Sequence, residues 1–396
     1  MKTYDFDHPP QRHGTNSVKW EHYPPDVLPL WVADMDFPAP QPVLTALHRY
    51  IDHGVFGYPN AMGGNDLPRL RGLLVERMER LYQWRIQPQD IVFVPGVVTA
   101  FHMASYAFVS SESAILVQPP VYPPILHAAQ TTGVISQEAP LEQIADGSYA
   151  INWERFAAAI TPETRMFLLC NPHNPVGRVF SRAELENFAE ICLRNNILIC
   201  SDEIHCDLLF SGYQHTPIAA ISPEIANQTI TLMAPSKTFN IAGLQCSFAI
   251  IPNPELRQMY QKANKGLVGW VNMLGLVAAE AAYAEDDEWL QQLLVYLEGN
   301  RDFLAEFVAE RLPGIHMVKP QGTYLAWLDC RELNLPGGPY EFFLDQARVA
   351  FNDGAAFGPG GDGFVRLNLA CSRSTLEQAL NRMQQAISKL SAPTPL

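Results

Sequence analysis

The stretch Ala234-Pro235-Ser236-Lys237-Thr238-Phe239-Asn240 places one lysine between a short apolar run, Thr229–Met233, and a polar loop that contains glycine. A lysine desolvated at the end of a buried strand loses part of its preference for the ammonium form. The neutral amine is suited to a Schiff base with an aldehyde cofactor. Considered alone, the same stretch also fits a surface-loop lysine, so its surroundings must decide between the two.

Further short apolar runs alternate with amphipathic helical patterns on both sides of this stretch. They cover residues 91–94, 114–117, 166–170, 197–201 and 247–251. The helix predicted over 181–195 opens with Ser181-x-x-Glu184, a reciprocal capping box. Because the runs lack a two-residue period, they predict strands buried on both faces of a mostly parallel sheet, and hence an α/β domain.

The pattern changes after about residue 286. A long helix is predicted over 286–312, strands over 324–328 and 364–369, and a closing helix over 375–390. We therefore divide the chain into an N-terminal segment (1–45) packing on the small domain, a large cofactor-binding domain (46–286) and a small α+β domain (287–396). The first 45 residues are rich in proline and aromatic side chains, and we expect no regular structure there.

Composition narrows the class of protein. The 396 residues are 47% hydrophobic and carry 27 basic against 41 acidic side chains, a net charge of −14, which argues against nucleic acid or an anionic membrane as a partner. The seven cysteines form no C-x-x-C pair and are expected to be reduced. No secretory signal is visible, and the apolar stretch 266–279 is too short to span a bilayer, so we expect a cytoplasmic protein.

Polar residues follow two of the predicted strands directly. Asp202 lies in Ser201-Asp202-Glu203-Ile204-His205, and Asn174 lies in the Pro- and Gly-rich stretch 170–177. Strands of a parallel sheet present such residues at its carboxyl edge. An acidic residue there could keep a pyridinium nitrogen protonated, and an asparagine could donate to a phenolate-like oxygen.

Three more candidates lie at strand ends or inside a strand. The turn Pro95-Gly96-Val97-Val98-Thr99 could bind a phosphate through the N–H groups of a helix start. Tyr122 could stack on a planar cofactor, or be a half-buried core tyrosine. Arg366 sits in an apolar strand, where it could bind a substrate carboxylate through two hydrogen bonds or form an internal salt bridge.

Together these residues resemble the fold-type I superfamily of aminotransferases that depend on pyridoxal 5'-phosphate (PLP). The resemblance covers nearly the whole chain and is sharpest to the MalY/PatB branch, the cystathionine β-lyase-like C–S lyases. The stretches that carry it are 19–20, 30–37, 56–58, 170–177, 201–205, 236–244, 322–325 and 366–368. It implies a large domain with a mostly parallel seven-stranded sheet between helices.

The resemblance also implies roles for the residues around the cofactor. Lys237 would hold PLP covalently and act as the catalytic base, Asp202 would face the ring nitrogen, and Asn174 would bond the ring hydroxyl oxygen. Tyr122 would stack on the ring. The resemblance also implies that the amides of Val97 and Val98 and the Ser236 side chain bind the phosphate. Tyr58 would reach the phosphate from the second subunit of a homodimer.

For the substrate, the resemblance implies that Arg366 binds the α-carboxylate and that Ala33 and Asp34 lie beside it. Three positions depart from the broader aminotransferase pattern: His205 replaces a common tyrosine, Ala234 replaces a Ser or Thr, and Gln245 stands near a common phosphate-binding arginine. His205, which the resemblance places among the cofactor contacts, fits the lyase branch. The departures argue against a generic aminotransferase.

The implied reaction is α,β-elimination from cystathionine or another S-substituted L-cysteine, giving a thiol, pyruvate and ammonia. An aminotransferase is the alternative, because both reactions begin with the same carbanion. A third hypothesis makes the chain a regulatory or binding protein on a PLP scaffold, and a secondary protein partner is compatible with either enzyme. No metal site is expected.

Overall fold

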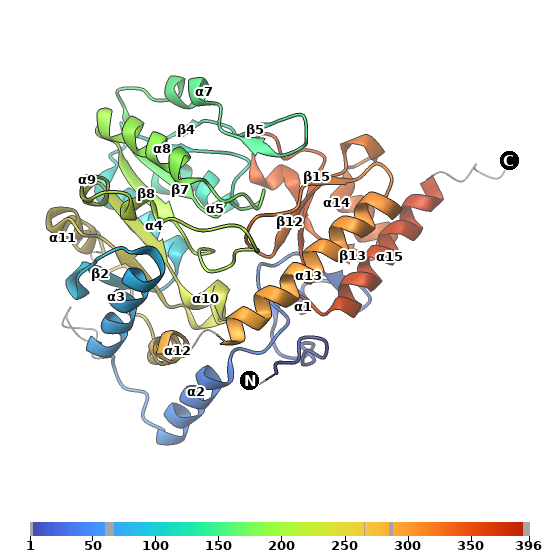
Figure 1. The fold of residues 1–396 in the computed structure, drawn as a ribbon, viewed down its shortest axis with the longest axis horizontal. Helices are drawn as coiled ribbons and strands as arrows, with labels where there is room; N and C mark the ends of the chain where they lie inside the picture. The colour runs from blue at the N-terminus through green and yellow to red at the C-terminus, as the bar shows by residue number, and fades with distance from the viewer. Residues whose placement is uncertain (1–2, 60–66, 265, 285–287, 391–396) are drawn as a thin grey trace.

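The computed structural model describes residues 3–59, 67–264, 266–284 and 288–390. A seven-stranded sheet forms the core of its larger part (Figure 1). Its strands, in spatial order, are β2 (Ile91–Val94), β10 (Ser247–Ile250), β9 (Thr229–Met233), β8 (Leu198–Asp202), β7 (Thr164–Cys170), β3 (Ala114–Val117) and β4 (Ile135–Glu138). Strand β10 runs antiparallel to its two neighbours, β2 and β9, and the other pairs in the sheet are parallel. The mostly parallel seven-stranded sheet is therefore confirmed.

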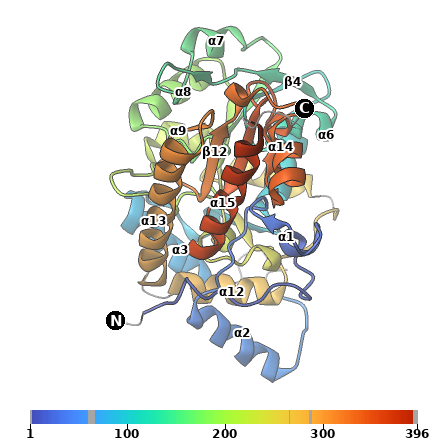
Figure 2. The same ribbon diagram turned by 90° about the vertical axis from the view of Figure 1, so that its right-hand side faces the viewer.

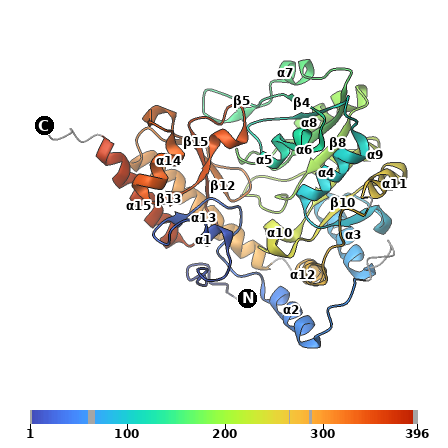
Figure 3. The same cartoon turned by 180° about the vertical axis from the view of Figure 1, so that it is seen from behind.

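Helices cover both faces of this sheet, as its strands require because they are apolar on both sides. One face packs against α4 (Val97–Phe108), α5 (Pro123–Leu126), α6 (Ala128–Thr132) and α11 (Pro254–Ala263) (Figure 3). The other packs against α3 (Pro68–Tyr82), α7 (Trp153–Ala158), α8 (Arg182–Arg194), α9 (Pro223–Asn227) and α12 (Met273–Ala284) (Figure 1). The capping box predicted at Ser181 and Glu184 is present at the start of α8.

A second, four-stranded antiparallel sheet lies beside the first. Its order is β11 (His316–Met317), β12 (Leu325–Asp329), β15 (Phe364–Asn368) and β14 (Asn352–Asp353). The helices α13 (Glu288–Arg311) and α15 (Arg373–Leu390) lie side by side over it (Figure 2), and α14 (Pro339–Phe342) is nearby. Asp286, the predicted start of the long helix, lies outside the described residues. The predicted domain boundary at 286/287 also lies outside them, so the division into three parts stays a proposal.

The N-terminal segment has more regular structure than its proline content predicts. It contains α1 (Val18–Glu21) and β1 (Leu28–Pro29), which pairs in parallel with β13 (Val349–Ala350). Helix α2 (Gln41–His53) also begins within it, and Pro42 occupies the second helical position. Proline is tolerated in a first turn because its missing N–H would have no helical partner there, so the expectation of no regular structure was wrong.

All seven cysteines are buried and none forms a disulfide. Within the described ranges, no helix combines the length and the apolar character that crossing a membrane demands.

Candidate active site

Lys237 lies on the short helix α10 (Pro235–Thr238), directly after strand β9. Its Nζ donates a hydrogen bond of 2.6 Å to the main-chain oxygen of Ala33. Burial, followed by the positive charge of Arg366, lowers the pKa of Lys237 to about 8, although Asp34 and Asp202 act in the opposite direction. A substantial share of the amine is therefore neutral near pH 8, which is the form that attacks an aldehyde or accepts a proton.

Asp202 ends strand β8, and only 4% of it is exposed. Its Oδ1 accepts a hydrogen bond of 3.1 Å from the Ile204 N–H. Burial raises the pKa of Asp202 to about 7, to which Glu203 contributes and which Lys237 opposes. A buried carboxylate with so little positive charge around it would be stabilised by a cationic ring nitrogen placed beside it.

Arg366 on β15 points from the small sheet toward the loop that follows β7. Its Nη1 donates to the Asn174 Oδ1 over 2.9 Å, and its Nη2 donates to Asn352 Oδ1 over 2.6 Å and to the Trp31 carbonyl over 3.1 Å. Because these acceptors are neutral, they leave the positive charge of the guanidinium uncompensated. The Nε is buried without a partner among the described residues, and burial lowers the pKa of Arg366 to about 10. These features favour a carboxylate ligand over the alternative of an internal salt bridge.

Tyr122 and His205 lie close to the same groups. The Tyr122 N–H donates to the Asn174 carbonyl over 2.9 Å, and burial, assisted by the nearby Asp202, raises the pKa of Tyr122. Burial and the charges of Lys237 and Arg366 lower the pKa of His205 to about 3, so its ring stays neutral. His205 Nδ1 is buried and has no partner among the described residues, which fits a group that the bound cofactor would satisfy.

A helix start lies at the predicted phosphate position. Gly96, with φ of +98°, precedes α4, and a Cβ built on it would meet nothing within 4 Å. The N–H groups of Val97 and Val98 belong to the first turn and have no acceptor within the helix. Ser236 is 9% exposed and adjoins Lys237. These features leave room for an anion, and the phosphate contacts themselves stay a prediction.

Tyr58 lies at the surface of the chain. Its side chain is 83% exposed, and its ring lies edge-on to Trp270 with the centroids 6.0 Å apart. Its contact with the phosphate, expected from a second subunit, stays a prediction.

The segment Trp31–Phe37, which we call the strap, joins the two sheets at the site. Asn240, three residues after Lys237, accepts from the Met35 N–H over 3.0 Å and donates to the carbonyls of Met35 and Phe37. From the small sheet, Asn368 Nδ2 donates to two further strap carbonyls, those of Val32 and Asp34, each over 2.6 Å. Both asparagines stood in the stretches that carried the resemblance, without an assigned role.

Asp34, expected beside the substrate, is held in a charged cluster within the N-terminal segment. Arg12 donates to both of its carboxylate oxygens over 3.1 and 2.9 Å. Arg12 and the fully buried Lys19 also pair with Asp36, over 2.9 and 3.0 Å. The position of Asp34 is thus fixed, while its side chain is still 20% exposed.

Tyr324 is a further site residue, which sequence reasoning missed. It is completely buried, and its hydroxyl donates to the Ala33 carbonyl over 2.8 Å, the same oxygen that Lys237 contacts. An aromatic residue beside an apolar strand is indistinguishable from a core tyrosine in the sequence. Among the described residues, no His, Cys, Asp or Glu side chains are grouped as a metal would require.

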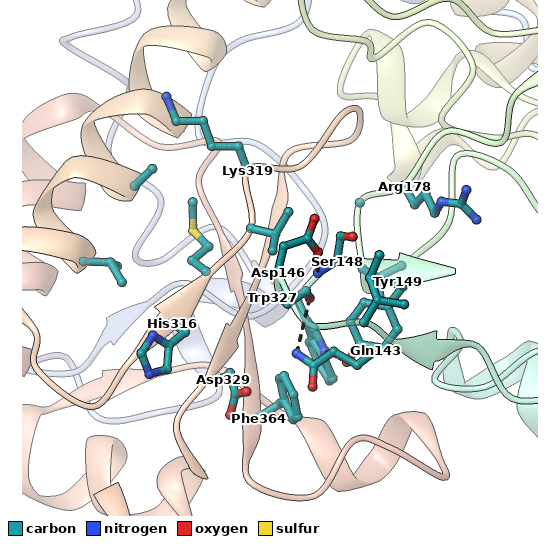
Figure 4. Close-up of a pocket in the computed structure, with 18 of the residues that line it drawn as sticks. Gln143, Asp146, Ser148, Tyr149, Arg178, His316, Lys319, Trp327, Asp329 and Phe364 are labelled. Carbon is teal, nitrogen blue, oxygen red and sulfur yellow. Dashed lines mark hydrogen bonds between the residues drawn. The ribbon is translucent and has the colours of Figure 1, made fainter. Parts of the chain in front are cut away.

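A separate cavity of about 440 Å³ lies between the hairpin of β5 (Glu142–Gln143) and β6 (Tyr149–Ala150) and the small sheet (Figure 4). Trp327 Nε1 on β12 of the small sheet donates to the hydroxyl of Tyr149 on β6 over 3.1 Å. Lys237 does not line this cavity, and nothing in it indicates a particular ligand.

The two packed sheets, with a lysine at the carboxyl edge of the larger one, define the fold of the fold-type I class of PLP-dependent enzymes. Within that class, the chain belongs to the class I and II aminotransferase family, whose sequence model matches residues 25–383.

Several relatives within this family cover almost the whole chain. Cystathionine beta-lyase PatB of Bacillus subtilis is 40% identical over 97% of this chain and 100% of its own length. Among solved structures, cystalysin from Treponema denticola, which contains a pyridoxal 5'-phosphate cofactor, is 33% identical with a TM-score of 0.93, covering 98% and 100% of the two chains. The PLP-bound C-S lyase from Staphylococcus hominis is 31% identical with a TM-score of 0.90, covering 98% and 99%.

Proposed function

We propose that this protein is a PLP-dependent carbon–sulfur lyase that eliminates a thiol from cystathionine or a related S-substituted L-cysteine, leaving pyruvate and ammonia. The observation that carries the proposal is the lysine at the junction of the two sheets, whose lowered pKa suits it to hold an aldehyde and then to act as a base. The named relatives support carbon–sulfur chemistry, and the identity of the thioether is the finer part of the proposal.

The residues described above fit PLP. Lys237 would hold it, Asp202 would pair with its ring nitrogen, and the Asn174 amide would donate to its ring oxygen. Tyr122 and His205 would line the ring, and the start of α4 with Ser236 would receive the phosphate. When bound, PLP supplies an electron sink that stabilises negative charge left on the substrate Cα.

The protein's own groups then perform the proton transfers and the orientation. Arg366 binds the substrate α-carboxylate through its planar fork, which orients the Cα–H bond. The freed amine of Lys237 removes the Cα proton, so that the C–H bond breaks and an N–H bond forms. The electron pair left behind forms the Cα–Cβ double bond as the Cβ–S bond breaks and the thiolate leaves. The released aminoacrylate then takes up water to give pyruvate and ammonia. Ala33 and Asp34 of the strap border the position proposed for the substrate.

The same removal of the Cα proton would also serve an aminotransferase, in which Lys237 delivers its proton to the cofactor carbon instead. Incubation of the holoenzyme with cystathionine, without a keto acid, separates the two. Continuous release of pyruvate and thiol supports the lyase. A single stoichiometric conversion of the cofactor to its amine form overturns it in favour of amino transfer.

The Lys237→Ala variant tests the central residue. We expect loss of the visible absorption of the lysine-bound cofactor and of thiol release. Lys319→Ala is the control, since that lysine is half exposed and pairs with Asp302 at 2.9 Å away from the site. Thiol release by the Lys237→Ala variant would contradict the assignment, once release catalysed by free PLP in solution has been subtracted.

We also propose that the active form is a homodimer in which Tyr58 completes the partner's site. Large apolar side chains are exposed in two segments, 51–58 and 267–270, that meet through the Tyr58–Trp270 contact. Apolar surface of this kind favours burial against a second copy. Mixing subunits that carry Tyr58→Ala with subunits that carry Lys237→Ala should restore activity that neither variant has alone, because one site of each hybrid keeps both native residues. No restoration, or a monomer by sedimentation, would contradict the dimer.

A further inference from the structure

Two side chains from different parts of the chain donate to the same main-chain oxygen. Lys237 Nζ lies 2.6 Å from the Ala33 oxygen, and the Tyr324 hydroxyl lies 2.8 Å from it. We propose that Tyr324 is a positioning residue which, through the Ala33 carbonyl, sets the place and the proton affinity of the free Lys237 amine. The importance of this for turnover rests on the proposed function, in which that amine is the base.

The Tyr324 hydroxyl is fixed as a donor. The side chain is 0% exposed, and the Tyr324 carbonyl accepts from the Leu369 N–H over 2.9 Å, which ties the residue to the small sheet. Burial raises the pKa of Tyr324 well above its ordinary value, and the nearby Asp34 adds to this while Arg366 opposes it. The hydroxyl therefore keeps its proton throughout the working pH range and can only donate to the carbonyl.

The Ala33 carbonyl is also held in place. The carbonyls on either side of it, those of Val32 and Asp34, both accept from Asn368 Nδ2 over 2.6 Å. A carbonyl oxygen has two lone pairs, and here one is used by Tyr324 and the other by Lys237. The Lys237 amine therefore donates to a fixed Ala33 oxygen whose other lone pair is already used by Tyr324.

The shared carbonyl has a predictable effect on proton affinity. A hydroxyl that donates to the oxygen draws electron density from it, which weakens the same oxygen as an acceptor for an ammonium group. The other groups that face Lys237 are Arg366, Asp34, Asp202 and the neutral His205, whose ring lies 6.0 Å from that of Tyr324. Tyr324→Phe replaces none of these residues and removes only the hydroxyl, which is neutral in the working pH range.

The first test measures Lys237 directly, in protein freed of cofactor. Brief acetylation with acetic anhydride over a range of pH, followed by mass spectrometry, gives the pH at which the Lys237 amine becomes reactive, with exposed Lys262 as the internal standard. We expect a midpoint near 8 in the unaltered protein. Tyr324→Phe should move it upward by roughly a few tenths of a pH unit, because one hydrogen bond alters the strength of a neighbouring one by roughly 10–30%.

Tyr260→Phe is the matched control. Tyr260 is also 0% exposed, and its hydroxyl also donates to a main-chain carbonyl, that of Ala100, over 3.0 Å. It packs between α11 and α4, away from the strap. Both variants should lose similar thermal stability, whereas only Tyr324→Phe should shift the Lys237 midpoint. Equal midpoints in the two variants would overturn the proposal.

The second test uses the loaded enzyme. The acidic limb of the kcat profile for thiol release should move to higher pH in Tyr324→Phe and stay unchanged in Tyr260→Phe. Because the acetylation midpoint does not depend on which reaction the enzyme catalyses, a shifted midpoint without lyase turnover would count against the proposed function alone. Normal lyase turnover with an unshifted midpoint would count against the role of Tyr324 alone.

Discussion

Arg366 and Asn174 are joined by a 2.9 Å hydrogen bond from the guanidinium Nη1 to the amide Oδ1, which connects β15 of the small sheet to the loop after β7. Because the amide oxygen is occupied in this way, the Asn174 Nδ2 is left to donate in another direction. The group proposed to bind the substrate carboxylate therefore also orients the group proposed to bind the cofactor ring oxygen.

This relationship predicts the effect of Arg366→Lys. Lysine keeps the charge but loses the planar fork, so it cannot satisfy a carboxylate and Asn174 together. We expect kcat/KM to fall roughly 100-fold, mainly through KM. Arg348→Lys is the control, because that arginine forms an exposed pair with Asp26. The difference between the two variants should vanish with a substrate ester, which lacks the carboxylate. An unchanged KM in Arg366→Lys would contradict the assignment of Arg366 as the carboxylate-binding residue.

Asp202→Asn should have opposite effects on stability and on catalysis. In the cofactor-free protein, the folded pKa of Asp202 is about 7, against an ordinary 3.8. A group with a raised folded pKa contributes stability that is present below pH 3.8 and is lost as the pH rises through 7. Above pH 7 the chain therefore carries a destabilising buried charge, which asparagine removes while it still accepts from the Ile204 N–H.

We expect cofactor-free Asp202→Asn to be more stable than the unaltered protein by a few kcal/mol at pH 8, and by less at pH 5. Urea unfolding at the two pH values measures this. With PLP bound, kcat should fall roughly 100-fold or more, because the charge that keeps the ring protonated is gone. A variant less stable than the parent at pH 8 would refute the electrostatic argument.

The sequence predicted those parts of the site that follow directly from strand ends. Lys237, Asp202 and Asn174 each come immediately after a buried run, and parallel strands bring such positions to one edge. By contrast, β10 runs antiparallel, and a strand buried on both faces leaves no periodic signature of its direction.

The strap contacts could not be predicted for a different reason. Asn240 and Asn368 bond residues 205 and 336 positions away, and no local pattern encodes such pairs. Tyr324 was overlooked because its hydroxyl partner is a main-chain oxygen, which any residue could supply. The short strand β1 of the N-terminal segment likewise depends on a partner strand, β13, far along the chain.

Gly96→Ala tests the phosphate position. Gly96 has φ of +98° and faces open space at the start of α4, so an added methyl group strains the backbone and occupies room proposed for the phosphate. Gly338, directly before α14, is matched, with φ of +89°, a similarly extended ψ and nothing within 4 Å of a built Cβ. Each alanine should cost roughly 1–3 kcal/mol of stability, because only glycine readily adopts this conformation. Titration with PLP should show roughly tenfold weaker binding for Gly96→Ala only; equal affinities would place the phosphate elsewhere.

Asn368→Asp tests whether the strap must be held for the site to work. The buried Asn368 amide nitrogen donates to two carbonyls, and its oxygen accepts from the Ala370 N–H over 2.8 Å. Aspartate has almost the same shape but would turn a carboxylate oxygen toward both carbonyls. We expect a loss of about 3 kcal/mol or more at pH 8. Burial beside those carbonyls raises the carboxyl pKa, so the loss should shrink as the pH falls and the protonated group donates to one of them.

Asn300→Asp separates this effect from general destabilisation. Asn300 is equally buried on α13, and its Nδ2 also donates to two carbonyls, those of Leu369 and Cys371. The Asn300 Oδ1 accepts from Arg373 Nε over 2.8 Å, so the new carboxylate gains an ion pair and Asn300→Asp should lose less stability than Asn368→Asp. Only Asn368→Asp releases the strap that carries Ala33 beside Lys237. At temperatures where both are folded, thiol release should therefore fall at least roughly tenfold more in Asn368→Asp, since small displacements of a catalytic group are costly. Equal residual activities would mean that the strap can move without disturbing the lysine.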